Sequence, residues 1–434
     1  MDYVSLAIVL MTILAIIFAP LERGLIALAG VVVLAVLSEN YTFVDAFKAV
    51  DWNVIMILIG MWTLSGYLSK SRVPEYLVYL AVERSASYGQ LLLTITLMAA
   101  FVTMFVDNVL VILLFGGLAV ETARKLRQNP LIAAMIVGLA ANYMGTALLL
   151  GDLPPQMLHS VAGAEFLDFI WFRGVPGSFL LLTLSYILTL AIFYRIWFGG
   201  LRNVPLSGLN LEKPEVDRVT AACSIAGFLV FIALASIRPM LGNVPLGAIS
   251  MSTAIATALT LEILRIRLNR IPSFEEVLRD MEWKVVIFYA SLFSLVKGLE
   301  IGGWIGSVAA TLSGYLAGPL ATSYTMTYWI VASLSTVIEH DAIILTTLVT
   351  LKQAATEHGI DPWPHLWATV WSGTLGSNAT IAGAPALYLS LVLAEKALGR
   401  KVVWHEWMKI TIPFTIVSLI IHYVISLIIF LTMW

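Results

Sequence analysis

The chain has 434 residues, of which 60% are hydrophobic and only 12% are charged, and its mean hydropathy is +0.92. This composition excludes a water-soluble globular protein and predicts a polytopic membrane protein. The net charge of −2 and the lack of a basic block argue against a nucleic-acid partner. The single cysteine, Cys223, excludes an intramolecular disulfide and a cysteine-based metal site.

Apolar runs of membrane length alternate with short polar loops, which predicts an all-α membrane protein. The first run is preceded by only one charge, Asp2, so it lacks the basic region of a signal peptide and predicts a retained helix. The runs cover residues 4–19, 24–38, 52–69, 174–199, 218–237, 247–264, 283–299 and 410–432.

Two further apolar segments, 90–122 and 323–353, are each divided by a charged tip. The arms on either side of Asp107 and Asn108 are too short to cross about 30 Å of hydrocarbon at about 1.5 Å per residue, so we expect a re-entrant hairpin. The residues that divide the second segment are Glu339, His340 and Asp341. Non-helical backbone at this depth is tolerated only where it is buried in protein or lines a cavity, so the tips predict a site within the membrane.

Each hairpin is followed by an apolar helix that glycine and proline interrupt, at 129–172 and at 362–396. A continuous helix does not tolerate these residues, so the pattern predicts two broken transmembrane helices. Matching breaks in two halves of a chain indicate a transport site, because freed carbonyls and half-helix ends can coordinate ions. The candidate site residues at the breaks are Gly145, Thr146, Asp152, Ser377, Asn378 and Thr380.

The same features recur at a constant spacing, which indicates an internal duplication. Asp107 and Glu339 are 232 residues apart, and Thr146 and Asn378 have the same separation. Duplication of a long unit is typical of secondary transporters. The predicted division of the chain is a first repeat at 1–199, a linker at 200–217 and a second repeat at 218–434.

The distribution of positive charge predicts how the repeats are threaded through the membrane. If both hairpins turn back, most of the 25 Lys and Arg residues fall on one side, which the positive-inside rule assigns to the cytoplasm. The linker is then cytoplasmic, both termini are outside, and the first hairpin opens inward while the second opens outward. The two repeats are therefore expected to be inverted, which suits alternating access to one shared site.

At these residues the chain resembles the ion transporter superfamily, which includes NhaD-type sodium/proton antiporters, arsenite permeases, the P protein and divalent-anion/sodium symporters. Its first-half pattern, a tip Asp-Asn followed by a glycine-rich segment with Gly-Asp and a pair of prolines, is matched by Asp107, Asn108 and residues 145–156. The second-half pattern is matched at 376–387, but the second tip reads Glu-His where the family usually has Asp-Asn. The resemblance implies a dimer, with a scaffold part and a moving part in each protomer and an ion site between the tips and the broken helices.

Each candidate also has a structural interpretation. Asp107 and Asp341 stand where helical arms begin, so they can act as N-caps, whereas Glu339 is a weaker cap and favours function. His340 has an imidazole that suits proton coupling, or it simply bonds to a carbonyl at the tip. Hydroxyl groups at the breaks can bond to their own helices, and Asp152 can be a turn or cap residue before the prolines.

The sequence favours a secondary active transporter that exchanges protons for Na⁺ or Li⁺ by alternating access. Acids within the membrane are costly and attract cations or protons, so Asp107 and Glu339 are expected to carry the coupled ions. No cofactor is expected beyond the transported Na⁺ and H⁺. The predicted Na⁺ ligands are Asp107, Asn108, Thr146, Glu339 and Asn378.

Two other transport functions stay open at this stage, arsenite efflux and sodium-coupled dicarboxylate symport. Arsenite favours thiolates, but Cys223 lies outside the repeat motifs, and the acidic tips repel a dicarboxylate. An enzyme is not expected, because the chain has no His-Glu-x-x-His or Gly-x-Ser-x-Gly motif. The expected partners are the lipid bilayer, a small inorganic ion and a second copy of the chain, in a multi-pass protein of the cell membrane.

Overall fold

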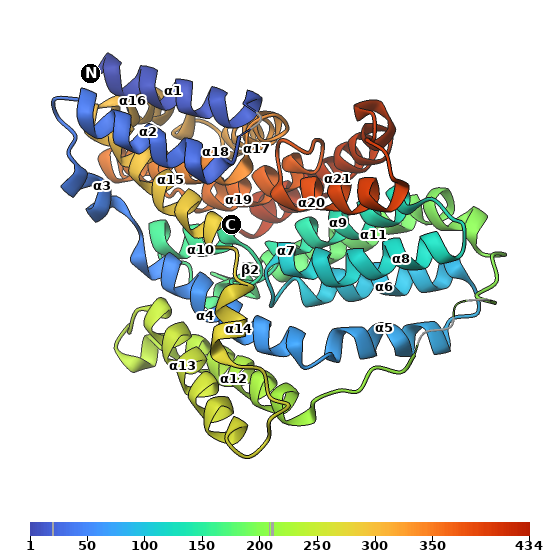
Figure 1. Cartoon of the computed structure of the whole chain (residues 1–434). Helices are drawn as coiled ribbons and strands as arrows, with labels where there is room; N and C mark the ends of the chain where they lie inside the picture. Colours follow the sequence, from blue (N-terminus) through green and yellow to red (C-terminus); the bar gives the residue numbers. More distant parts are fainter. Residues whose placement is uncertain (20, 208, 210–211) are drawn as a thin grey trace.

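The computed structural model describes residues 1–19, 21–207, 209 and 212–434, and most of these residues are helical (Figure 1). The sheet within this part of the chain is a two-stranded antiparallel ribbon in which Trp171 lies opposite Pro176. Its strands are β1 (Trp171–Phe172) and β2 (Val175–Pro176). The predicted all-α membrane fold is therefore confirmed.

The helices of the first half begin at polar caps and continue into apolar segments. Asp51, for example, accepts the N–H groups of Asn53 and Val54 and so begins α4. The elements are α1 (Tyr3–Phe18), α2 (Arg23–Leu37), α3 (Phe43–Ala49), α4 (Trp52–Lys70), α5 (Val73–Arg84), α6 (Tyr88–Val102), α7 (Asn108–Val111), η1 (Ile112–Gly116), α8 (Gly117–Lys125), α9 (Pro130–Gly145), α10 (Leu153–Ala162), η2 (Phe166–Phe169), α11 (Ser178–Phe198) and η3 (Gly199–Leu201).

The second half repeats the succession of long helix, hairpin and broken helix. It ends in α21, whose 30 residues contain Pro413 within the helix. The elements are α12 (Arg218–Ser236), η4 (Arg238–Leu241), α13 (Leu246–Arg265), α14 (Phe274–Arg279), α15 (Trp283–Ile301), α16 (Trp304–Leu316), α17 (Leu320–Ser335), α18 (His340–His358), α19 (Trp363–Ser377), α20 (Pro385–Leu398) and α21 (Trp404–Met433).

Five helices of the described chain are long and apolar enough to cross a membrane, namely α4, α11 with η3, α12, α13 and α21. A sixth candidate is the pair of α15 and α16, which is bent by 74°. The bend lies at Gly303, whose φ of +79° is a conformation that glycine adopts without strain. The runs predicted at 4–19 and 24–38 fold as the apolar helices α1 and α2, which are shorter than a full span.

The two predicted re-entrant hairpins are present. The first runs through α6, turns at residues 103–107 and returns through α7, η1 and α8. Its return arm contains a π-helix, η1, a feature that is frequent at functional sites. The second hairpin consists of α17 and α18, which meet at residues 336–339. Both hairpin arms therefore end at the acidic tips that the sequence marks.

The two predicted broken helices are also present. In the first, α9 stops at Gly145 and α10 starts at Leu153; in the second, α19 stops at Ser377 and α20 starts at Pro385. Proline within the first turn of α10 and of α20 fits the helix start, where an N–H group has no partner to lose. The chain therefore has the inverted-repeat transporter fold that its sequence predicts.

Glycine is required where each break passes the hairpin of its own half. A Cβ atom on Gly151 would lie 2.2 Å from the carbonyl oxygen of Thr103, at the end of α6. A Cβ atom on Gly383 would lie 2.3 Å from the carbonyl oxygen of Ser335, at the end of α17. Each residue of the second contact is 232 positions after its counterpart in the first. The two halves thus fold alike around the breaks.

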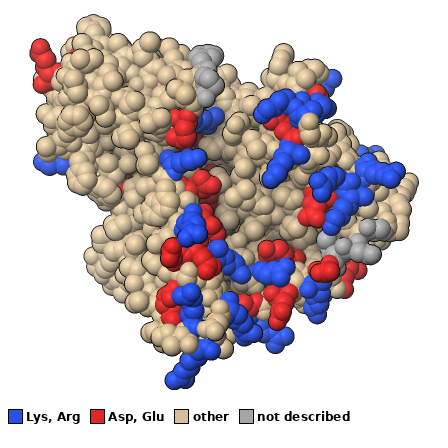
Figure 2. Space-filling view, viewed as in Figure 1, with Lys and Arg blue, Asp and Glu red and all other residues tan. Residues whose placement is uncertain are grey.

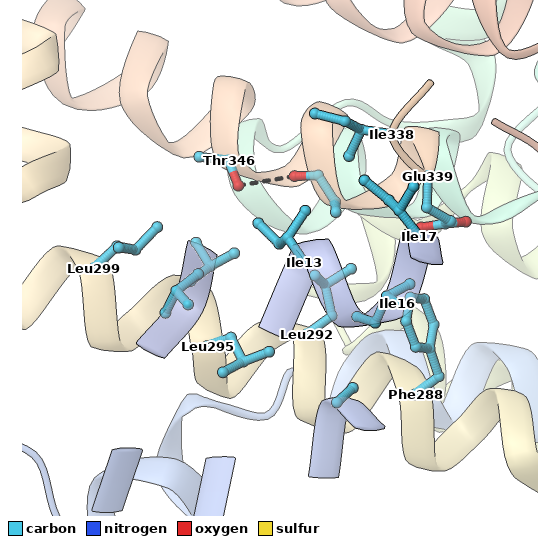
Figure 3. Close-up of a pocket in the computed structure, with 14 residues that line it drawn as sticks. Ile13, Ile16, Ile17, Phe288, Leu292, Leu295, Leu299, Ile338, Glu339 and Thr346 are labelled. Atoms are coloured by element: carbon cyan, nitrogen blue, oxygen red, sulfur yellow. Dashed lines mark hydrogen bonds between the residues drawn. The ribbon is translucent and has the colours of Figure 1, made fainter. Parts of the chain in front are cut away.

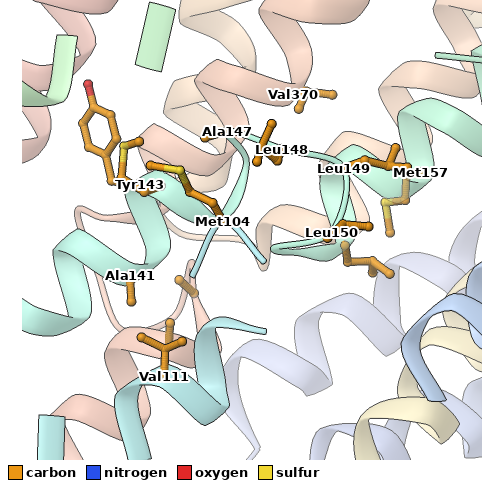
Figure 4. Packing of buried hydrophobic residues seen from close by; sticks show 14 of the residues in the cluster. Met104, Val111, Ala141, Tyr143, Ala147, Leu148, Leu149, Leu150, Met157 and Val370 are labelled. Carbon is orange, nitrogen blue, oxygen red and sulfur yellow. The ribbon is translucent and has the colours of Figure 1, made fainter. Parts of the chain in front are cut away.

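The halves pack through equivalent elements in exchanged positions. The first arm of one broken helix lies along the second arm of the other, since α9 packs on α20 and α19 packs on α10. Such reciprocal contacts are the signature of a two-fold axis, here within one chain. At the first break, Leu148, Leu149 and Leu150 are buried in the same core as Met104 of the hairpin turn and Met157 of α10 (Figure 4). The unwound backbone is therefore enclosed in protein.

Charged side chains gather on one part of the surface. Figure 2 shows them over the centre, the right and the lower part of this face, while the upper left is almost free of charge. The charge-poor part covers the region of α1 and α2 in Figure 1. This separation is expected of a protein whose apolar surface faces lipid.

Candidate functional site

A cavity of about 690 Å³ leads from the surface to a group of buried polar side chains. Its outer part includes the exposed residues Leu21 and Lys284, and its inner end includes Asn108 and Asp152, which are 5% and 4% exposed. The lining comes from α1, α2, α4, α7, α15, α18, α20, the loop between α1 and α2, and the residues just before α7, α10, α15 and α18. Both halves of the chain therefore build the cavity.

Asp107 forms the tip of the first hairpin and serves two purposes. Its Oδ1 accepts the N–H group of Val109 at 3.0 Å and so caps α7. Its carboxylate also lines the large cavity and a second cavity of about 270 Å³, which it shares with Trp62 and Leu113. The capping interpretation is thus supported for Asp107, but capping does not remove the carboxylate from the cavities.

Asn108 connects the tip to the first break. Its Nδ2 donates to Oδ2 of Asp152 at 2.8 Å, which leaves its own Oδ1 as an acceptor. The other oxygen of Asp152 accepts the N–H group of Leu153, so this carboxylate also begins α10. A Cβ atom on Gly145 would lie only 3.2 Å from the Cβ of Asp152. Gly145 therefore leaves space for the side chain of Asp152, and it has no side chain of its own that could bind an ion.

Asn142 of α9 joins the two breaks across the two-fold axis. Its Nδ2 donates to Oγ of Ser377 at 3.0 Å and to Oδ1 of Asn378 at 3.1 Å. On the other side, Nδ2 of Asn108 lies 3.4 Å from its Oδ1. A continuous set of hydrogen bonds thus runs from Asp152 to Asn378 through the two intervening asparagines.

Thr146 makes the reciprocal contact. Its Oγ1 donates to Oγ1 of Thr374 at 2.9 Å. Thr374 is 232 residues after Asn142, and Asn378 is 232 residues after Thr146. The pair of Asn142 with Asn378 is therefore equivalent to the pair of Thr374 with Thr146, as a two-fold axis requires. Thr146, Ser377 and Asn378 are fully buried in this contact and do not line the large cavity. Their role as ion ligands stays a prediction.

Thr380 lies near the same break but outside the cavity lining. Its Oγ1 donates to the carbonyl oxygen of Thr336 and accepts the N–H group of Ala382. These bonds connect the second break to the turn of the second hairpin. The described contacts of Thr380 are thus local to the second half.

The second tip brings three ionisable side chains together. His340 lies with its Nε2 3.4 Å from Oδ1 of Asp341 and its Nδ1 3.8 Å from Oε1 of Glu339. The imidazole Nδ1 is 2.9 Å from the carbonyl oxygen of Gly383, and the hydroxyl of Tyr289 donates to Oδ2 of Asp341 at 3.0 Å. Asn108 and His340 are equivalent in the repeat, and each contacts the break of its own half.

Glu339 occupies the N-cap position of α18, but its side chain does not cap the helix. Both carboxylate oxygens are buried without a hydrogen-bond partner among the residues that the structure describes. Figure 3 shows its carboxylate beside Ile16 and Ile17 of α1, in a small apolar cavity that Phe288 also lines. Unlike Asp107, Glu339 has no structural function that its local contacts reveal.

Charged residues line both the rim and the inner end of the large cavity. The rim carries both signs: Arg23, which is half-buried, and Lys284, which is exposed, lie near the starts of α2 and α15, with the exposed acids Glu22 and Glu282 beside them. The two basic residues belong to the side that the positive-inside rule assigns to the cytoplasm. The carboxylates at its inner end are those of Asp107, Asp152, Glu339 and Asp341. Such an interior favours cations and protons over anions.

Sequence reasoning missed three residues of this site, Asn142, Tyr289 and Trp62. Asn142 could have been found, because it is the one amide side chain within the apolar helix α9. Tyr289 and Trp62 have no such signal, since aromatic residues are frequent throughout a membrane protein. Only the fold shows that they face the tips.

A family model described as a citrate transporter matches residues 13–372 of the chain. An uncharacterised transporter of Mycobacterium bovis is 25% identical over 408 residues, which cover 92% of this chain and 91% of that protein. The P protein of Sus scrofa is 24% identical over 486 residues, which cover 93% of this chain and 56% of that protein.

The fold is similar to the crystal structure of the Alcanivorax borkumensis YdaH transporter. The TM-score is 0.58, with 14% sequence identity, and the match covers 98% of each chain. The predicted resemblance to the ion transporter superfamily is confirmed by these relatives. Because the family model spans most of the chain and both hairpin tips, this protein belongs to the citrate transporter family of membrane transporters.

Proposed function

We propose that this protein is a proton-coupled cation antiporter that exchanges protons for Na⁺ or Li⁺ by alternating access. The observation that carries the proposal is the acidic inner end of the large cavity, where the carboxylates of Asp107, Asp152, Glu339 and Asp341 lie. A carboxylate in a membrane interior favours the bound proton or a bound cation over the empty charged state. Exchange of the two on the same carboxylates couples one flux to the other.

Asp107 and Glu339 are the exchanging acids in this mechanism. Both line the cavity, and they occupy equivalent positions of the repeat. Oδ1 of Asn108 is the additional oxygen next to the first acid, since its Nδ2 is engaged by Asp152. In this mechanism Thr146 and Asn378 support the site by fixing the two breaks to each other, instead of coordinating the ion directly.

The cavity of this structure corresponds to the inward-open state in the proposed cycle. Its exposed rim contains Lys284, and Arg23 lies beside it, both on the predicted cytoplasmic side. In the alternate state the same acids face the outside, as inverted repeats allow. We place the protein in the cell membrane as a homodimer, in line with the resemblance to the superfamily.

Citrate transport is the second candidate, and the description of the family favours it. A free tricarboxylate would meet four carboxylates at the inner end of the cavity, which disfavours it electrostatically. Protonation of these acids or a cation bound between them would offset the repulsion. Arsenite efflux and dicarboxylate symport are further alternatives. Transport of neutral arsenite would not need the carboxylates of the cavity. A dicarboxylate, like citrate, would be repelled by them.

Proteoliposomes with an imposed pH gradient test the proposal. Na⁺ or Li⁺ should dissipate the gradient, whereas K⁺, arsenite, succinate and citrate should not. If protons and Na⁺ share the acids, acidification must weaken apparent Na⁺ affinity by up to about tenfold per pH unit for each competing proton. A Na⁺ affinity that is constant between about pH 5.5 and 8.5 would refute the mechanism. Gradient-driven uptake of citrate without Na⁺ exchange would establish the second candidate instead.

A further inference from the structure

The second hairpin tip collects three ionisable side chains, each with at least one polar atom that has no hydrogen-bond partner among the described residues. Ligand atoms of Glu339, His340 and Asp341 all lie within 4.8 Å of one another. The three side chains are 3%, 1% and 1% exposed. Both oxygens of Glu339, Nε2 of His340 and Oδ1 of Asp341 make no hydrogen bond within the described chain. Buried polar atoms are normally satisfied, so these unpartnered atoms are available to a ligand.

The opposite atom of two of these side chains is held in place. Nδ1 of His340 lies 2.9 Å from the carbonyl oxygen of Gly383, which can only accept, so Nδ1 carries a proton; in the neutral imidazole, Nε2 then offers a lone pair. The hydroxyl of Tyr289 donates to Oδ2 of Asp341 and leaves Oδ1 free. Metal-binding histidines usually donate their other ring N–H to a carbonyl, and ligating carboxylates are themselves hydrogen-bonded.

The spacing and the chemistry of the donors indicate a class of ion. Nε2 of His340 is 3.4 Å from Oδ1 of Asp341, and two ligands about 2.1 Å from a tetrahedral ion are about 3.4 Å apart. Imidazole nitrogen suits first-row transition metals, whereas Na⁺, Mg²⁺ and Ca²⁺ prefer sites made of oxygen. The first tip, with Asp107 and Asn108, presents oxygen ligands only.

Charge balance points in the same direction. Glu339 and Asp341 carry two negative charges when ionised, and a divalent ion neutralises both, whereas a monovalent ion leaves one buried charge. Ile16 and Ile17 lie on the apolar side of Glu339, and the hydroxyl of Thr346, which lines the same small cavity, donates to the carbonyl oxygen of Ala342 instead (Figure 3). We propose that Glu339, His340 and Asp341 form a binding site for a first-row divalent transition-metal ion such as Zn²⁺ or Co²⁺. Binding of this ion does not depend on the proposed transport function. Only the idea that the protein transports the ion rests on that function.

Absorption spectroscopy with Co²⁺ alone tests the site in the purified full-length protein without a polyhistidine tag. The wild type should bind Co²⁺ with ligand-field bands that indicate nitrogen and oxygen ligands. His340→Gln should weaken binding at least about 100-fold, and Tyr289→Phe, which removes only the bond to Asp341, by about 10- to 100-fold. His405→Gln is the matched control, because His405 is exposed, and it should bind Co²⁺ as the wild type does.

Three outcomes would overturn the site: no Co²⁺ binding by the wild type, equal binding by His340→Gln, or, if that variant aggregates, equal binding by Tyr289→Phe. Na⁺/H⁺ exchange measured on the same preparation separates this inference from the proposed function. Co²⁺ binding without exchange refutes the proposed function and supports the site. Exchange without Co²⁺ binding refutes the site and leaves the antiporter in place.

Discussion

Substitutions at the two tip acids should separate capping from ion binding. Oδ1 of Asp107 accepts the N–H group of Val109, whereas Glu339 occupies the equivalent position without capping α18. Asparagine keeps an oxygen acceptor at an N-cap and alanine does not. Asp107→Ala should therefore lower the free energy of unfolding by about 1 kcal/mol, and Asp107→Asn by only a few tenths of that.

Glu339 should behave differently. Its carboxylate oxygens are buried without partners in the described chain, so neither Glu339→Gln nor Glu339→Ala removes a stabilising bond. Relief of the desolvation cost should leave stability equal to or above that of the wild type. Exchange of Na⁺ for protons should nevertheless be lost in all four variants, because each removes an exchanging carboxylate.

The thermal midpoint of the purified protein and the dissipation of a pH gradient in proteoliposomes measure the two effects. For a chain of this size, about 1 kcal/mol corresponds to a shift on the order of 1 to 2 °C. Full exchange by Asp107→Asn together with loss of exchange by Asp107→Ala would show that Asp107 only caps the arm. A lower midpoint for Glu339→Gln than for Asp107→Ala would contradict the geometry of the second tip.

Three further predictions concern the breaks and the cavity. Asn142→Ala should lower the thermal midpoint and the exchange rate together, because it leaves the buried Oδ1 of Asn378 without its donor at a cost of about 1–3 kcal/mol; an unchanged midpoint would refute the bonding role of Asn142. Gly151→Ala and Gly383→Ala should each lose most folded protein in size-exclusion chromatography, since the added Cβ meets a carbonyl oxygen at 2.2 or 2.3 Å, and a normal yield of either would contradict the close approach. A cysteine at Tyr388, which is 52% exposed at the cavity, should react with impermeant thiol reagents from the cytoplasmic side in a Cys223→Ala background; reaction from outside only would reverse the predicted topology.

The sequence was sufficient to predict the hairpins, the breaks and the acidic tips, because their signals are local. An acid within an apolar segment is costly wherever the segment packs, and Asp107 and Glu339 stand out for that reason. Glycine and proline interrupt a helix whatever its neighbours are, so Gly151 and Gly383 also mark the breaks. Repetition at 232 residues then relates the two halves without any knowledge of contacts.

The spacing could not show which side chains of a broken helix face the cavity. Thr146 and Asn378 have the expected spacing, but they pair with Thr374 and Asn142 across the two-fold axis. Their partners come from the other half of the chain, and single-sequence periodicity carries no information on such contacts. For the same reason, the bond from Tyr289 to the second tip is visible only in the fold.

The symmetry of the backbone and the asymmetry of the tips have different consequences. Equivalent glycines and reciprocal contacts of α9 with α20 and α19 with α10 show that the two halves share one topology, so in the proposed cycle each half takes up the conformation of the other. The side chains do not follow this symmetry, because Asn108 is replaced by His340 at the second tip. Exchange of the two conformations would therefore reverse the side from which the site is reached without exchanging the chemistry of its ligands. In the proposed cycle, access therefore depends on the repeated backbone, and ion selectivity depends on the residues at which the repeats differ.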